Sequence, residues 1–300
     1  MEYRFHTADV FTDKTFGGNQ LAVLPDARGL TTEQMVSITR EFNYSETIFV
    51  LPPDDPAHTR RLRIFVPGGE IPFAGHPTVG GAYVLGITGE IPLTGDETRI
   101  IFEEGVGPVP VLIRSRNGKP FFTQLTAAKT PEKNDQVYDA ATIAPLVSLS
   151  EDDIDLGSGK AMEGWTAGLP YLYVPLKNRD ALKRARSRAD LVEKTLAGKW
   201  TREIVVFTTD GEDYRVRMFA PLVGVPEDPA TGSAAAAFAG YVGSRLSMQD
   251  GIHAFTIHQG VEMGRPSRLD VEIDFSAGAI SAVRVGGASV LISSGTLYVT

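Results

Sequence analysis

Residues 63–85 read RIFVPGGEIPFAGHPTVGGAYVL, and residues 217–243 read RMFAPLVGVPEDPATGSAAAAFAGYVG. Both stretches begin with Arg-x-Phe-x-Pro, and after a three-residue insertion a Glu, a Pro and a Gly coincide again. Each stretch predicts a strand, a tight loop and the start of a helix. Such an internal repeat predicts two related halves, and we expect one site to be assembled between them.

The two predicted helices lack a charged residue, since residues 76–85 and 233–242 contain no Asp, Glu, Lys or Arg. A helix without a polar face must be surrounded by protein. The sequence therefore predicts an α+β fold with two pseudo-symmetric halves, each a barrel-like, mainly antiparallel sheet around a central apolar helix. We expect the N-terminal half to comprise residues 1–125 with a return strand in 286–300, and the C-terminal half residues 126–285.

Two local predictions concern the C-terminal half. The polar residues 126–136 contain a Pro and are the best candidate for a linker between the halves. The basic residues 179–196 are predicted to be helical.

Composition excludes several classes of function. The 300 residues carry a formal net charge of −8 and include no Cys. The charge argues against a nucleic-acid partner, and the missing Cys excludes disulfides, thiolate nucleophiles and zinc–thiolate sites. The longest apolar run, 234–242, is too short to cross a bilayer, and the N-terminus does not resemble a signal peptide. We expect a cytoplasmic protein without contact to membranes.

The sequence also lacks the residue patterns that indicate a metal site or a dinucleotide-binding site. The five His residues show no metal-ligand spacing, and no dinucleotide fingerprint is present. The residues therefore predict neither a metal site nor a dinucleotide site.

The two Gly-to-helix junctions are candidate anion sites. Gly75 and Gly232 allow close approach of a ligand, and the following backbone N–H groups and the helix dipole attract negative charge. One such junction alone would more simply be a structural turn. Two matched copies favour the hypothesis that both helix starts face a cleft and hold a carboxylate-bearing ligand.

Four side chains near these junctions carry candidate chemistry, each beside a simpler interpretation. Glu46 heads an apolar strand and is either a surface residue or a partly buried general acid/base, whose pKa desolvation would raise. His76 either packs as a helix-start residue or orients the substrate and holds a proton. Asp228 is either an Asx-turn residue or binds an amine or supports His76, and Ser233 is a helix cap or a ligand contact.

These motifs resemble those of the PhzF-like phenazine-biosynthesis family. The likeness is carried by residues 9–12 with 17–23, by 45–47, by 72–78 and by 228–234, in an order that spans nearly the whole chain. Gln20 departs from the pattern, because Pro is common there in the family. The resemblance implies the diaminopimelate-epimerase-like fold and cofactor-free acid/base chemistry.

The resemblance also implies roles for individual residues. The best-understood member of the family isomerises trans-2,3-dihydro-3-hydroxyanthranilate, with a Glu that moves a proton between ring carbons. By this likeness Glu46 is the acid/base, and His76 and Asp228 polarise the substrate or bind its amine. The implied substrate-binding residues are Asn19, Ser45, Gly75, Thr231, Gly232 and Ser233.

The expected function is a cofactor-free isomerase that moves a proton within a small carboxylate-bearing metabolite. Related epimerases and proline racemases use paired Cys thiols at the helix starts, so the absence of Cys excludes a two-thiol racemase. The alternatives that stay open are an epimerase or racemase with non-thiol bases, and a non-catalytic small-molecule binding protein. The expected partners are a small anionic metabolite and, by family analogy, a second copy of the chain in a homodimer.

Overall fold

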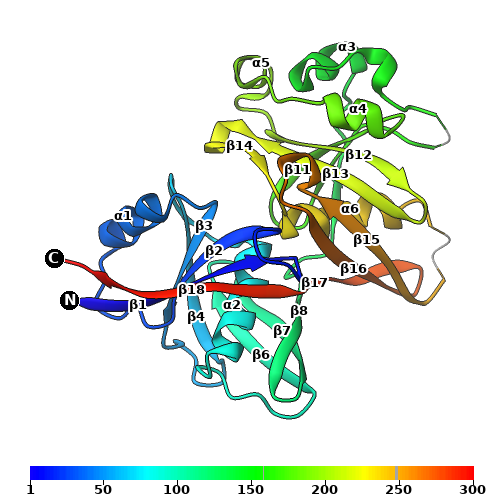
Figure 1. Cartoon of the computed structure of the whole chain (residues 1–300). Coiled ribbons are helices and arrows are strands. Elements are labelled where there is room, and N and C mark those ends of the chain that lie inside the picture. Colours follow the sequence, from blue (N-terminus) through cyan, green and yellow to red (C-terminus); the bar gives the residue numbers. More distant parts are fainter. Residues whose placement is uncertain (158, 247–248) are drawn as a thin grey trace. The chain divides into compact units, whose positions relative to one another are not determined.

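The computed structural model describes residues 1–157, 159–246 and 249–300. Contacts divide the chain into two compact units, which Figure 1 shows in the colours of the sequence. Unit 1 comprises Met1–Ala128 and Val285–Thr300, and unit 2 comprises Lys129–Arg284. No helix within the described ranges is long and apolar enough to cross a membrane.

Unit 1 is a curved sheet with one helix inside it and one outside it. In chain order its elements are β1 (Glu2–Val10), β2 (Asn19–Leu24), α1 (Thr32–Phe42), β3 (Glu46–Leu51), β4 (Arg60–Val66), β5 (Gly69–Ile71), α2 (Gly75–Ile87), β6 (Glu97–Glu104), β7 (Gly107–Arg116), β8 (Lys119–Thr126) and β18 (Ser289–Tyr298).

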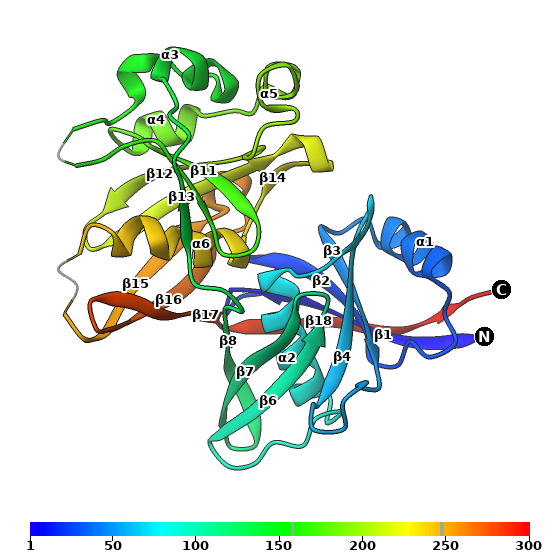
Figure 2. The ribbon, with the colours of Figure 1, turned by 180° about the vertical axis from the view of Figure 1, so that it is seen from behind.

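The sheet of unit 1 wraps around α2. Its strands lie in the order β18–β1–β2–β3–β4–β6–β7–β8, with parallel pairing of β2 with β3 and of β4 with β6 and antiparallel pairing elsewhere. The short β5 forms a hairpin with β4. Strands from both ends of this order contact α2 (Figure 2), whereas α1 packs on the outside against β3 and β4.

Helix α2 has no solvent-exposed face. Every residue from Gly75 to Gly86 is buried, because glycines in the helix bring it close to the sheet. A Cβ added to Gly80 would lie 2.4 Å from a methyl group of Val10, and one added to Gly81 would lie 2.6 Å from a methyl group of Ile48. The expectation of a helix enclosed by protein is confirmed here.

Unit 2 repeats this plan with more helix on its outer side. Its elements are β9 (Glu132–Asn134), α3 (Ala140–Ile143), η1 (Ala144–Val147), η2 (Glu151–Asp153), β10 (Glu163–Thr166), β11 (Pro170–Pro175), α4 (Arg179–Arg184), α5 (Ala189–Leu196), β12 (Glu203–Asp210), β13 (Asp213–Ala220), η3 (Pro221–Val223), β14 (Val225–Asp228), α6 (Gly232–Gly243), β15 (Gly251–Gln259), η4 (Val261–Met263), β16 (Ser267–Ser276) and β17 (Ala279–Gly287), which continues into unit 1.

The strand order β9–β10–β11–β12–β13–β15–β16 has the same alternation of pairings as unit 1. Again two pairs are parallel, β11 with β12 and β13 with β15, and the rest are antiparallel. A short strand, β14, forms a hairpin with β13 and leads into α6, whose twelve residues are all buried. The two units are therefore α+β structures of one topology, as the repeat predicted.

The repeated residues make the same contacts in both units. Arg63 forms a bidentate ion pair with Glu70, at 2.8 and 2.5 Å, and its guanidinium lies 5.1 Å from the ring centre of Phe65. In unit 2, Arg217 forms an ion pair with Glu227 at 2.8 and 2.7 Å, and its guanidinium lies 5.2 Å from the ring centre of Phe219. Each ion pair closes the hairpin that precedes the enclosed helix, so the fold repeats at the level of single interactions.

Residues 179–196 form two short helices, so the prediction of one helix there is wrong. Arg217 explains the break, because its Nη1 donates to the carbonyls of Leu182 and Ala185 at 2.9 and 2.7 Å. These carbonyls belong to the last turn of α4 and to its C-cap, so the buried guanidinium ends the helix. The linker candidate 126–136 also contains a short strand, β9.

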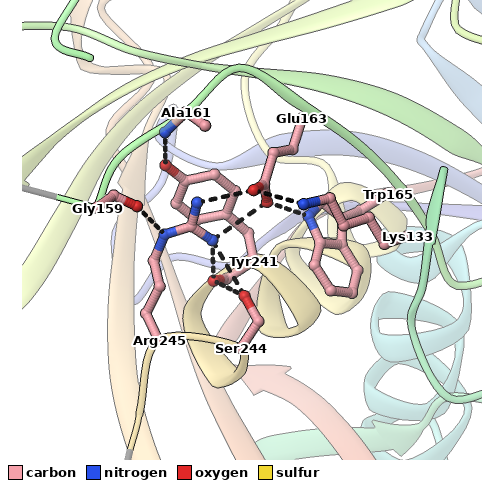
Figure 3. A network of polar contacts seen from close by, with 8 residues as sticks. All are labelled: Lys133, Gly159, Ala161, Glu163, Trp165, Tyr241, Ser244 and Arg245. Carbon is pink, nitrogen blue, oxygen red and sulfur yellow. Dashed lines mark hydrogen bonds and ion pairs between the residues drawn. The ribbon is translucent and has the colours of Figure 1, made fainter. Parts of the chain in front are cut away.

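A polar network closes the C-terminal end of α6 (Figure 3). Glu163, the first residue of β10, accepts from Lys133 and Trp165 at 2.8 Å each and from Arg245 at 3.0 and 3.2 Å. The Arg245 guanidinium lies 3.6 Å from the ring centre of Tyr241 and donates to the carbonyl of the same residue at 2.8 Å. This network fastens the end of α6 to β10 and is structural.

We predict that Gly80→Val destabilises the protein. The new side chain would collide with Val10 and Leu21, both fully buried, and overpacking of this kind costs about 1–3 kcal/mol. Urea unfolding measures the change. Gly68→Val is the matched control, since the nearest atom to a Cβ there is 4.0 Å away. Equal stability of the two variants would contradict the close packing around α2.

Candidate active site

The start of α2 brings together three of the predicted site residues. Asn19 and Glu46 are the first residues of β2 and β3, and His76 is the second residue of α2. The Nδ1 atom of His76 lies 3.4 Å from Oε2 of Glu46 and 3.3 Å from Nδ2 of Asn19. Because β2 and β3 are parallel neighbours, their first residues lie at the same edge of the sheet, beside the helix start.

Burial keeps the His76 ring uncharged. The residue is 2% exposed, and desolvation lowers its pKa from 6.5 to about 3, against a smaller opposing effect of the Gln20 carbonyl. That carbonyl lies 3.3 Å from Nε2 and can only accept a hydrogen bond. The neutral ring therefore carries its hydrogen on Nε2, which leaves Nδ1 as an acceptor.

The acceptor at Nδ1 decides how Glu46 can interact with it. A protonated Glu46 carboxyl can donate to Nδ1, whereas an ionised one cannot, and in that state the amide of Asn19 supplies the donor. The Glu46 side chain is 16% exposed, so it is neither sealed in the core nor surrounded by bulk water. The geometry thus accommodates both protonation states of one partly buried carboxyl, which is what proton transfer requires.

The start of α6 holds a second polar cluster. Thr231, the N-cap, donates to a carboxylate oxygen of Asp228 at 2.5 Å. Gln259 donates to the Asp228 carbonyl at 2.8 Å and to the Thr231 hydroxyl at 3.0 Å, and its own carbonyl accepts from the Thr231 backbone N–H at 3.2 Å. Ser233 lies apart from these contacts, with its Oγ 2.7 Å from the hydroxyl of Tyr171. All of these side chains are buried.

The remaining predicted residues lie at the expected places in the chain. Ser45 directly precedes β3 and is half-buried, and Gly75 and Gly232 are the first residues of α2 and α6. The structure thus gathers Asn19, Glu46 and His76 in unit 1. It gathers Asp228 and Thr231 in unit 2. The shared cleft and the roles of these residues stay predictions.

The duplication reveals a carboxyl that sequence reasoning missed. Glu203 is the first residue of β12, and it opposes Tyr171 in a parallel pair just as Glu46 opposes Leu21. Burial raises the pKa of the half-buried Glu203. Glu203 could have been found by extending the repeat from Arg63 and Arg217 to the preceding strands, β3 and β12. These two strands share little else in sequence.

The site shows no sign of a metal centre. Within residues 1–157, 159–246 and 249–300, no three His, Asp or Glu side chains are grouped so that they could hold a metal ion.

Comparisons with known proteins show the family to which the chain belongs. The profile of the family described as phenazine biosynthesis-like protein matches residues 8–295. An uncharacterized isomerase of Mesorhizobium japonicum is 40% identical over 97% of each chain. The trans-2,3-dihydro-3-hydroxyanthranilate isomerase of Pseudomonas aeruginosa is 32% identical over 99% of each chain.

Solved structures support the fold. A Bacillus anthracis phenazine biosynthesis protein of the PhzF family superposes with a TM-score of 0.88, at 24% identity and full coverage of both chains. A hydroxyproline epimerase from Agrobacterium vitis superposes with a TM-score of 0.66, at 14% identity, over 99% of this chain and 91% of the other. The expected epimerase-like fold is thereby confirmed.

We predict that His76 makes the protein less stable in acid. Below its ordinary pKa of 6.5 the unfolded chain binds a proton at this residue, while the folded ring stays neutral until about pH 3. The free energy of unfolding should therefore fall on this account by up to about 1.4 kcal/mol per pH unit between these values. Urea titrations from pH 7 to pH 4 should show a shallower loss for His76→Gln, and parallel curves would contradict the neutral ring.

Proposed function

The chain belongs to the phenazine biosynthesis-like family of isomerases, and on this premise we propose that it moves a proton within a small carboxylate-bearing metabolite without a cofactor. The observation that carries the proposal is the 3.4 Å contact between the Glu46 carboxyl and the acceptor nitrogen of a neutral, buried His76.

Glu46 is the acid/base of the proposed reaction. As a carboxylate it takes a proton from one carbon of the substrate, and as a carboxylic acid it returns that proton to another carbon, so that the enzyme ends unchanged. Neutral His76 accepts a hydrogen bond from the acid form, and the Asn19 amide satisfies the ring when Glu46 is ionised. Proton transfer by a positioned carboxyl supplies about 10²–10⁴-fold in rate.

The helix starts supply the proposed binding of the substrate carboxylate. Within the described residues, neither Ala74 before α2 nor Thr231 before α6 caps its helix with a side-chain hydrogen bond. The first N–H groups of a helix have no partner within the helix, and together with the helix dipole they favour an anion at such a start. Asp228, buried beside the start of α6, is proposed to interact with an amine or hydroxyl of the same ligand.

The substrate class follows from the chemistry of these groups. A ligand with a carboxylate, a neighbouring polar substituent and an acidic C–H fits them. The compound named for the Pseudomonas aeruginosa relative, trans-2,3-dihydro-3-hydroxyanthranilate, has these features, and we propose it or a close analogue as the substrate.

A second candidate function is epimerisation by two carboxyl groups. It requires one base for each face of a carbon, and the observation that favours it is Glu203, which occupies in unit 2 the strand position of Glu46. This reaction would invert one carbon, whereas the isomerase moves a proton between two.

We predict that Glu46→Gln loses at least about 10²-fold in turnover of trans-2,3-dihydro-3-hydroxyanthranilate, because the amide cannot exchange the proton. Absorbance assays measure turnover, and calorimetry should show that the variant still binds the compound. Wild-type turnover by Glu46→Gln would refute the role.

Glu203→Gln is the matched control, since it removes the equivalent carboxyl of unit 2. The isomerase proposal predicts turnover within a few-fold of the wild type for this variant. A loss as large as that of Glu46→Gln, together with inversion at a single carbon, would instead establish the two-base epimerase.

A further inference from the structure

Glu104 is a buried carboxyl that the proposed reaction does not use. It is the last residue of β6, contacts Thr78 in the first turn of α2 and is 8% exposed. Its Oε1 atom lies 2.6 Å from the Thr78 hydroxyl. Its Oε2 atom is buried without a hydrogen-bond partner among the described residues.

The hydrogen atoms at this contact can be counted. The Thr78 hydroxyl lies 2.8 Å from the Ala74 carbonyl and 2.6 Å from Glu104, but a hydroxyl has one hydrogen to donate. The carbonyl can only accept. Two full two-centre hydrogen bonds form here if Thr78 donates to Ala74 and Glu104 itself carries a proton, which it donates to Thr78; an ionised Glu104 would have to share the single hydroxyl hydrogen with the carbonyl.

Unit 2 has a residue that corresponds to Glu104. The parallel partners of β4 and β13 make Glu104 the counterpart of Gln259. The glycine that follows each residue packs against the matching loop proline. A Cβ on Gly105 would lie 2.7 Å from Cα of Pro72, and one on Gly260 would lie 2.6 Å from the Pro229 carbonyl oxygen.

Gln259 holds the start of α6 through an uncharged amide, by its bonds to Asp228 and Thr231. Glu104 occupies the same place beneath the start of α2. In unit 2 the side chain at this position is therefore an uncharged amide.

We propose that Glu104 is a positioning residue that holds the first turn of α2, and with it His76, as a neutral carboxylic acid, and that its ionisation releases this turn. The effect on turnover rests on the proposed function, whereas the protonation of Glu104 does not.

The surroundings of Glu104 agree with a neutral acid. Its side chain contacts Thr78 of α2, the next residue in the chain packs against Pro72, and its partner across the β6–β7 hairpin is Gly107. Desolvation raises its pKa to about 8, the Thr78 hydrogen bond opposes this, and no charged group of the described chain contributes. The titratable residue on the same helix turn, His76, is itself neutral above about pH 3.

Ionisation would rearrange the turn. A carboxylate at residue 104 cannot donate, so the single hydrogen of Thr78 turns toward it and the Ala74 carbonyl loses that bond. Ala74 is the N-cap of α2 and stands two residues before His76. The helix start should therefore change with a midpoint near pH 8.

NMR of the histidine rings tests this without a substrate. The chain has five His, and His76→Gln assigns the relevant signal. The wild-type His76 signal should shift with a midpoint near pH 8, although the ring itself does not titrate there, and Glu104→Gln should abolish the shift. The carboxyl carbon of Glu104 should titrate with the same midpoint.

Two further variants keep the test decisive. Thr78→Val removes the hydrogen-bond partner of both forms of Glu104. The bond to the carboxylate is the stronger of the two, so the midpoint should move to higher pH. Glu103→Gln is the control, because Glu103 is the preceding residue and backbone N–H groups of residues 54 and 55 lower its pKa to about 2. This variant should leave the midpoint of the His76 shift unchanged.

A Glu104 carbon that titrates near 4.5, or a His76 signal that is unchanged between pH 6 and 9, would overturn the proposal. Either result leaves the role of Glu46 standing. Loss of turnover by Glu46→Gln and the titration of Glu104 are thus independent measurements.

Stability gives a second readout. The unfolded chain releases the Glu104 proton above the ordinary pKa of 4.5, whereas the folded protein holds it to about pH 8. The unfolding equilibrium constant should therefore rise on this account with pH across this window, by up to about tenfold per pH unit. Glu104→Gln should lack that contribution, and an unchanged pH slope in the variant would contradict the neutral acid.

Discussion

A helix without a polar face can exist in water only when other parts of the chain cover it on every side. This constraint determines the structure of each unit. Helices α2 and α6 are buried along their whole length, so each sheet must curve until strands from both of its ends contact the helix. The glycines of α2 permit the close approach. At the start of each helix the first backbone N–H groups have no partner within the helix itself.

Equivalent contacts hold the starts of α2 and α6 in place. An Arg–Glu pair closes each preceding hairpin, a Gly–Pro contact supports the loop from the neighbouring strand, and Glu104 or Gln259 holds the first turn. On this common frame the two units carry different chemistry. Unit 1 has a neutral imidazole beside a carboxyl, and unit 2 has buried hydroxyls beside Asp228. Duplication supplied two equivalent places, and substitution at a few positions made them different.

Much of this was readable in the sequence, and the reasons are physical. The enclosed helices follow from their lack of charge, and the family follows from motifs that place Glu46, His76 and Asp228 at the ends of elements. Other features depend on contacts that no local pattern encodes. The break within residues 179–196 comes from Arg217, which is distant in sequence. Glu203, Gln259 and Glu104 became visible only through strand register, because register shows which residues of the two units correspond.

The central proposal is that an enclosed helix start binds the carboxylate of a substrate whose reacting carbon lies at Glu46. The most direct measurement is a crystal structure of Glu46→Gln with trans-2,3-dihydro-3-hydroxyanthranilate bound. The account predicts the ligand carboxylate on backbone N–H groups of a first helix turn and a ring carbon within hydrogen-bond reach of residue 46. A ligand bound away from residue 46, with its carboxylate in solvent, would contradict it.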